Sequence, residues 1–120
     1  MIKKLEIAGV HMPVGSELHS YVLKKIGLLD KYIPRHARQS AHVEVKLKEH
    51  QSKNKQSHTC EVIMRLPKEV ITQKETAQTA FAAVDVCEEK LKTQLHKYKE
   101  LHDPKLRQRL FVRLRKSNEI

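Results

Sequence analysis

The chain of 120 residues lacks features that several protein classes require. It has no tryptophan, and aromatic residues make up 4% of it, which argues against the base-stacking platforms that bind single strands. Its three glycines form neither a Gly-x-Gly-x-x-Gly motif nor a Walker loop, so we expect no phosphate cradle. No apolar run approaches the roughly 20 residues that cross a bilayer. These absences predict a cytoplasmic protein without a membrane partner.

Metal and catalytic patterns are also missing. Cys60 and Cys87 stand far apart in the sequence at apolar-periodic positions, which predicts buried, reduced thiols. None of the eight histidines forms a His-x-x-x-His pair, and there is no Cys-x-x-Cys. Asp85, Glu88 and Glu89 cluster early in an expected helix, where we interpret them as stabilising the helix dipole. We expect no enzyme activity, metal, cofactor or small-molecule substrate.

Hydrophobic periodicity predicts six elements in one domain. Apolar residues alternate in four segments and recur at helical spacing in two others. Strands are expected over 2–10, 41–48, 60–66 and 69–74, and helices over 16–32 and from Thr76 or Thr79 to Pro104. Residues 49–57 carry no apolar side chain and are expected to form a solvated connection.

One-sided alternation in the strands indicates that one face of the sheet is covered, and two amphipathic helices are available to cover it. We therefore predict an α/β two-layer sandwich of order β-α-β-β-β-α. Its four-stranded sheet would carry both helices packed side by side on one face. The domain is expected to span 1–102, followed by a basic tail at 103–120.

Positive charge is the strongest indication of a partner. The chain has 24 Lys and Arg against 14 Asp and Glu, a formal net charge of +10, which favours a polyanion. At about 100° per residue, Lys90 aligns with Lys97 and Lys92 with Lys99, so two basic rows run along the second helix. The first helix adds further lysines beside them. The expected nucleic-acid contacts on the helices are Lys24, Lys25, Lys31, Lys90, Lys92, Lys97 and Lys99.

The tail after Pro104 is basic as well, with six basic residues against one acid. We expect an arm that becomes ordered on nucleic acid, because phosphate neutralisation would favour its binding. A solvated tail is the open alternative, and a membrane-surface helix is a weaker third. The candidate contacts here are Lys105, Arg107, Arg109, Arg113 and Arg115.

The second helix resembles a known family. Its Phe81-Ala82-Ala83-Val84-Asp85, followed by Lys90-Leu91, Gln94-Leu95 and Lys97-Tyr98-Lys99, is similar to the ribosome hibernation-promoting factors and the related ribosome-associated inhibitor. The resemblance implies binding to ribosomal RNA of the small subunit, in the channel that holds messenger RNA and transfer RNA anticodon arms. It also implies inhibition of translation by occupancy, without chemistry. We expect a monomer away from the ribosome.

Two positions depart from the family pattern. Leu28 stands where a basic residue is usual, and Thr93 stands where the motif has Arg. The chain is also shorter than long-form factors, which pair ribosomes through a second domain. The alternative function is a regulator whose basic face binds an acidic protein surface, such as an alternative sigma factor, because family members carry that label.

Overall fold

The structure is a computed structural model that describes residues 1–102 of the chain. The expected tail contacts, Lys105, Arg107, Arg109, Arg113 and Arg115, lie outside the described residues. In chain order the elements are β1 (Lys4–Val10), α1 (Ser16–Lys25), η1 (Gly27–Tyr32), α2 (Arg35–Arg38), β2 (His42–Ser52), β3 (Lys55–Leu66), β4 (Glu69–Ala77) and α3 (Ala80–His102). The η1 segment is a 3-10 helix, and the short α2 was not expected from the sequence.

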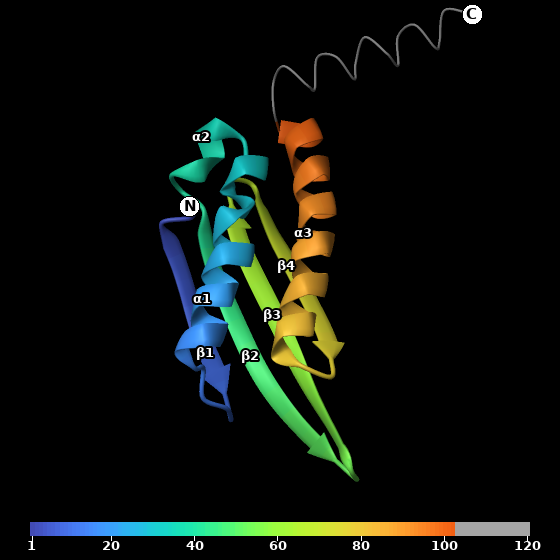
Figure 1. The fold of residues 1–120 in the computed structure, drawn as a ribbon. Coiled ribbons are helices and arrows are strands. Elements are labelled where there is room, and N and C mark those ends of the chain that lie inside the picture. Colours follow the sequence, from blue (N-terminus) through green and yellow to red (C-terminus); the bar gives the residue numbers. More distant parts are fainter. Residues whose placement is uncertain (103–120) are drawn as a thin grey trace, which may run out of the picture.

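The four strands form one mixed sheet in the order β1-β2-β3-β4. β1 runs parallel to β2, and the other two pairs are antiparallel. Figure 1 shows α1 and α3 side by side on one face of this sheet. Val43, Val45 and Leu47 of β2 are buried under them, while the intervening residues are more exposed. The predicted fold class and element order are confirmed.

The first helix is shorter than predicted. Its α-helical part ends at Lys25 and continues as η1, so a single helix over 16–32 was wrong. Gly27 favours this break because glycine is a weak helix former. In addition, the carbonyl of Gly27 accepts a hydrogen bond from the backbone N–H of Ile2 at 2.9 Å. The Gly27 carbonyl thus has a tertiary partner at the start of the chain.

The expected connection over 49–57 was also wrong. β2 and β3 stay paired through this segment, out to Ser52 opposite Lys55. The turn consists of Lys53 and Asn54, with φ angles of 24° and 70°. Positive φ at both positions gives a two-residue turn whose twist matches that of the strands. The resulting hairpin extends beyond the helices in Figure 1, which explains why it needs no apolar residues.

The long helix α3 packs its apolar side on the sheet and is fixed near both ends. Thr79 caps its first turn, since its Oγ1 accepts a hydrogen bond from the Ala82 N–H at 3.1 Å. Near the other end, the buried Tyr98 donates its hydroxyl to the Pro67 carbonyl at 2.8 Å. The predicted core stripe is buried as expected: Ala80, Val84, Cys87, Leu91, Leu95 and Tyr98. Within residues 1–102, no helix has the length and apolar character of a membrane span.

Candidate nucleic-acid interface

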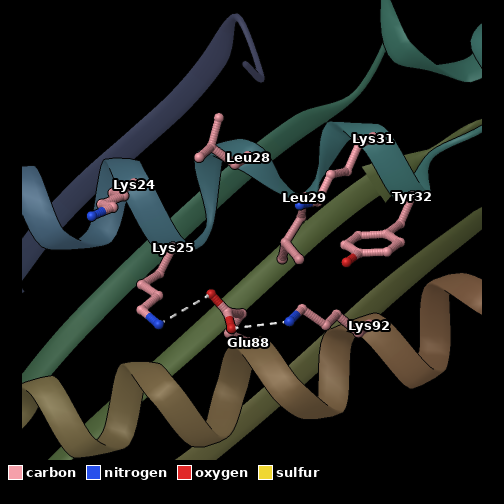
Figure 2. A pocket seen from close by; sticks show the side chains of 8 residues that line it. All are labelled: Lys24, Lys25, Leu28, Leu29, Lys31, Tyr32, Glu88 and Lys92. Atoms are coloured by element: carbon pink, nitrogen blue, oxygen red, sulfur yellow. Dashed lines mark ion pairs between the residues drawn. The ribbon is translucent and has the colours of Figure 1, made fainter.

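A hollow of about 240 Å³ opens on the helical face, between the α1/η1 segment and α3. We call it the lysine hollow, because four of its eight lining residues are lysines and one is an acid. In Figure 2, Lys25 and Lys92 point toward Glu88 from the two sides, whereas Lys24 and Leu28 point away from α3. The lining residues are Lys24, Lys25, Leu28, Leu29, Lys31, Tyr32, Glu88 and Lys92.

Glu88 holds two of the lysines together at the centre of the hollow. Its Oε1 lies 3.3 Å from Lys92 Nζ, and its Oε2 lies 3.9 Å from Lys25 Nζ (Figure 2). The Glu88 side chain is 12% exposed, so these lysines balance an almost buried charge. The hydrogen bond to Glu88 raises the pKa of Lys92 above its ordinary value. Lys92 therefore stays cationic at neutral pH, and the ammonium groups of both lysines are turned toward Glu88 (Figure 2).

The other two lysines of the hollow are exposed. Lys24 and Lys31 form no ion pair with any residue in the range 1–102. Lys31 Nζ lies 5.3 Å from the centre of the Tyr32 ring, and Lys92 Nζ lies 5.9 Å from it. Both are cation–π distances, so Tyr32 holds positive charge on its ring from η1 and from α3. The exposed ammonium groups remain available to an anion.

A second contact ties α1 to α3 beside the hollow. The Tyr21 hydroxyl donates a hydrogen bond to Asp85, which also lies 3.7 Å from Lys25 Nζ. The Tyr21 ring packs edge-on against Phe81, with ring centres 5.1 Å apart. The hydrogen bond to Asp85, with a smaller contribution from burial, raises the pKa of Tyr21 to about 12. Lys25 belongs to α1, and the acids of α3 fix the position of its ammonium group.

The structure separates the two basic rows of α3. Lys92 faces η1, and His96, one turn further on, packs against Tyr32, with ring centres 5.8 Å apart and ring planes tilted by 60°. Lys90 instead lies on the flank toward β4, where its Nζ is 2.5 Å from Glu75 Oε1. Helical spacing places Lys99 on the first row and Lys97 on the second. The structure thus brings only the Lys92 row beside Lys24, Lys25 and Lys31.

The β4 flank carries a simple surface ion pair. The Lys90 side chain is 54% exposed, and the Glu75 side chain is 18% exposed. The hydrogen bond from Lys90, assisted by one from Gln73, holds the pKa of Glu75 below its ordinary value. Lys97 is exposed on the same row.

The acids of α3 do not have the role that the sequence indicated. No acidic residue lies in the first turn of the helix, so the helix-dipole interpretation of Asp85, Glu88 and Glu89 was wrong. Asp85 and Glu88 bind Lys25, and Glu89 lies on the surface at 3.6 Å from Lys92 Nζ. The spacing of Glu88 and Lys92, four residues apart, was the one sequence signal for this network.

The two family departures lie on different helical segments, and both are exposed. Leu28 is 46% exposed and lines the lysine hollow, where a basic residue would add to its charge. Thr93 is exposed on α3, and its hydroxyl donates to the Glu89 carbonyl at 3.5 Å. Tyr32 is a member of the hollow that sequence reasoning missed as a binding residue.

Both thiols are enclosed in the core, away from solvent. Cys60 and Cys87 are free and fully buried, as predicted. Cys87 Sγ lies 3.2 Å from the Cys60 carbonyl oxygen. The hydrogen bond with Cys87, together with burial, raises the pKa of the Cys60 thiol.

One group of metal-ligating side chains lies on the sheet, in the part of the chain described. Potential ligand atoms of Glu6, His42 and Glu44 come within 4.8 Å of one another. These side chains already have partners, because Arg65 Nη1 is 2.9 Å from Glu44 and His42 Nε2 is 3.6 Å from Glu6. The absence of a metal remains a prediction.

Comparison with known proteins identifies the family of this chain. The profile of the family described as "Sigma 54 modulation protein / S30EA ribosomal protein" matches residues 5–102. A ribosome hibernation promotion factor of Lactococcus lactis subsp. cremoris (strain MG1363) is 31% identical over 96 residues, which make up 80% of this chain and 49% of that protein. The chain thus spans about half the length of this curated relative.

Two solved structures share the fold. The N-terminal domain of Thermus thermophilus Protein Y has a TM-score of 0.66 and 22% identity, covering 78% of this chain and 94% of that one. A ribosomal subunit interface protein from Coxiella burnetii has a TM-score of 0.60 and 22% identity, covering 80% and 97%. At such identity these likenesses show the fold alone. The family profile, by contrast, confirms the resemblance carried by the α3 motif, and the chain belongs to the sigma 54 modulation protein / S30EA ribosomal protein family.

Proposed function

We propose that this protein binds the small ribosomal subunit and inhibits translation by occupying the channel for messenger RNA and transfer RNA anticodon arms. The observation that carries the proposal is the lysine hollow, where four lysines from α1, η1 and α3 lie on one face. Ribosomal RNA presents the dense, ordered phosphates that such a face can follow. The names of the Lactococcus and Coxiella relatives, which refer to ribosome hibernation and to a ribosomal subunit interface, support this partner.

Inhibition is steric in this proposal and involves no reaction. The sheet holds α1 and α3 as one layer, so the lysines approach RNA as a fixed array. Phosphate contacts of this kind fix position and orientation without reading the base sequence. A monomer in the cytoplasm would suffice, since the array lies on a single chain.

The contacts divide into two groups by position. Lys24, Lys25, Lys31 and Lys92 form the centre, and Lys99 continues their row. Lys90 and Lys97, on the flank toward β4, make outlying contacts. The tail residues Lys105, Arg107, Arg109, Arg113 and Arg115 add a further arm that increases electrostatic affinity.

Sedimentation in sucrose gradients tests the partner. We expect the protein to co-migrate with purified small subunits at low salt and to be released at high salt. Preloading the subunits with messenger RNA and transfer RNA should reduce binding, because the ligands compete for one channel. Binding unaffected by these ligands would contradict channel occupancy. Absence of co-migration at low salt would contradict ribosome binding altogether.

A matched pair of variants tests the surface. Lys24→Ala/Lys31→Ala removes two charges from the hollow, and Lys46→Ala/Lys74→Ala removes two from the opposite face of the sheet. Lys46 alternates with the buried Val45 and Leu47, which places it on that opposite face. Only the first variant should lose affinity. Equal losses would show that net charge, and not this face, accounts for binding.

A further inference from the structure

The far end of the β2–β3 hairpin stands free of the rest of the domain. β1 pairs with β2 only as far as Lys48, and β4 pairs with β3 only from His58 onward. Residues 49–57 therefore form a two-stranded ribbon, to whose edges no other strand of the range 1–102 pairs. The ribbon extends beyond α1 and α3 (Figure 1). At about 3.4 Å per residue, its arm from Glu49 to Ser52 gives it a reach of about 14 Å.

The composition of the ribbon favours contact with a nucleic-acid backbone. Every side chain in it is polar, so it offers nothing to the hydrophobic centre of a protein interface or to a membrane. Hydroxyl, amide and ammonium groups, in contrast, are the groups with which proteins contact phosphate and sugar oxygens. The ribbon carries these groups on Gln51, Ser52, Lys53, Asn54, Lys55, Gln56 and Ser57.

The positive charge of the ribbon is concentrated at its tip. Lys53 and Lys55 are exposed, and neither forms an ion pair with another residue of the described range. Glu49, the one acid of the ribbon, lies at its base, where it accepts a hydrogen bond from the side-chain amide of Gln56. An anion that approaches the tip thus meets two lysines whose charge no carboxylate balances.

Lys53 occupies the tip in spite of an unfavourable backbone conformation. The φ angles of Lys53 and Asn54 are 24° and 70°, in the left-handed region. Asparagine and glycine enter this region readily and are the usual residues of such turns, whereas a lysine there is strained. None of the three glycines of the chain, by comparison, has a positive φ. A strained residue that is exposed at a hairpin tip points to a role for its side chain.

We propose that the ribbon is a second RNA-binding element, which contacts the backbone of a double-helical segment of ribosomal RNA across its minor groove. The major groove of A-form RNA is too deep and narrow for side chains to read, whereas its minor groove is wide and shallow and displays 2′-hydroxyl groups. The amides and hydroxyls of the ribbon bond to these groups, and Lys53 and Lys55 bind the bordering phosphates. The inference deepens the proposed function, on which it rests, by assigning a second contact to the same partner.

The ribbon and the lysine hollow lie at separate places on the domain. The ribbon extends past the ends at which α1 and α3 begin (Figure 1), whereas Lys24 and Lys25 of the hollow lie in the last turn of α1. A single contact would leave the domain free to pivot on the RNA, and two separated contacts fix its orientation. The ribbon can therefore be altered while the hollow stays intact.

A shortened ribbon provides the first test. Replacing Gln51–Gln56 by Asn-Gly removes the tip and two residue pairs, and closes the hairpin with a favoured turn. All six residues are exposed, so the core is untouched, and thermal unfolding checks that the chain folds. Lys46→Ala/Lys74→Ala is the control, since it also removes two positive charges, but both of these lysines lie directly opposite Glu61 on the sheet.

We expect the shortened chain to bind purified small subunits about tenfold more weakly than wild type. Its salt slope should fall by up to about 1.8, at about 0.9 for each phosphate contact on a double helix. The control should stay near wild type in both. An unchanged affinity of the shortened chain, or an equal loss in the control, would overturn the proposal.

Two single substitutions separate the charge of the tip from its folding. Lys53→Asn and Asn54→Gly each bring the turn closer to the favoured Asn-Gly sequence, but only the first removes a positive charge. Neither should lower the melting temperature. Affinity for small subunits should fall about threefold in Lys53→Asn and stay unchanged in Asn54→Gly. Equal affinities of the two variants would contradict a phosphate contact by Lys53.

Nucleic-acid duplexes separate this inference from the proposed function. Wild type and the shortened chain are titrated with an RNA duplex of about 16 base pairs and with a DNA duplex of the same sequence. Wild type should prefer the RNA about threefold, and shortening should remove the preference, because DNA lacks the 2′-hydroxyl groups. No preference, or one that survives shortening, would overturn the ribbon proposal. Failure of wild type to bind small subunits would contradict the proposed function instead, while the duplexes still test the ribbon.

Discussion

On the flank of α3 that faces α1 and η1, Lys92 shares a nearly buried carboxylate with Lys25, whereas on the flank that faces β4, Lys90 pairs with Glu75 alone. The first arrangement joins two helices and gathers four lysines around one hollow. The second joins a helix to a strand through one exposed contact. Two lysine rows of one helix thus differ in what surrounds them, and the difference comes from tertiary packing.

The two flanks of α3 differ in how strongly water screens their ion pairs. Exposed ion pairs contribute little to stability, about 0.2–1 kcal/mol, because water screens them. An acid with 12% exposure is screened less, so removing its partners costs more. We therefore expect the flank toward η1 to respond to mutation in both stability and binding, and the flank toward β4 to respond weakly in both.

The largest effect comes from removing the packing that holds both flanks in place. Leu91 is fully buried in the core, whereas Leu101 on the same helix is 57% exposed. Leu91→Ala should lower the free energy of unfolding by about 2–5 kcal/mol, because it leaves a cavity between α3 and the sheet. Leu101→Ala should change it by less than about 0.5 kcal/mol. Urea denaturation of both variants checks this, and similar losses would contradict the assigned burial.

Binding to small subunits separates the flanks directly. Lys24→Ala/Lys31→Ala should weaken binding about tenfold, or ~1.4 kcal/mol, and Lys90→Ala/Lys97→Ala only about threefold. Both variants remove two positive charges, so non-specific attraction falls equally. Filter binding over a salt series measures the affinities and the loss of slope. A larger effect from Lys90 and Lys97 would shift the interface to the β4 side of α3.

The fold could be predicted largely because burial dictates periodicity. Alternation in β2 and the stripe through Val84, Cys87 and Leu91 mark the two sides of one core. The pairing within residues 49–57 was missed, because a hairpin outside the core is held by backbone hydrogen bonds that leave no apolar pattern. The end of α1 was missed because Ile2 bonds to Gly27 from the far end of the chain.

The candidate site was predictable only in its composition. Charge and helical spacing identified the lysines of both rows. Spacing alone could not show whether the row of Lys90 or the row of Lys92 lies beside the first helix. Which row meets the first helix depends on how α3 rotates on the sheet. The role of Glu88 was likewise hidden, since a glutamate in a helix gives no sign that a lysine from another helix lies opposite.

The tie between Tyr21 and Asp85 should give the flank toward α1 a distinct alkaline sensitivity. The pKa of Tyr21 is raised to about 12 because its neutral hydroxyl donates to Asp85, so the folded state holds this proton more tightly than the unfolded state. Its stabilisation is complete below about pH 10 and is lost as the pH rises toward 12. Tyr21→Phe should lower stability by about 0.5–1.5 kcal/mol at neutral pH.

Melting temperatures of wild type and Tyr21→Phe, measured in parallel from pH 8 to pH 12, test this tie. The difference between the two proteins should shrink above about pH 10, because the wild type then loses the same hydrogen bond. Lysine titration affects both proteins alike and cancels in the difference. A gap that stays constant across the range would show that the hydroxyl contributes nothing through Asp85.

The smallest effect is expected on the other flank, at the pair of Glu75 and Lys90. The hydrogen bond from Lys90 holds the pKa of Glu75 below its ordinary value of 4.5, so its stabilisation is present above about pH 4.5 and is lost as the pH falls further. Glu75→Gln should lower stability by at most about 1 kcal/mol at neutral pH, and the gap should close in acid. Guanidinium unfolding at pH 7 and pH 3 measures this. A loss as large as that of Leu91→Ala would mean that this ion pair helps to seat α3, and the contrast between the flanks would fail.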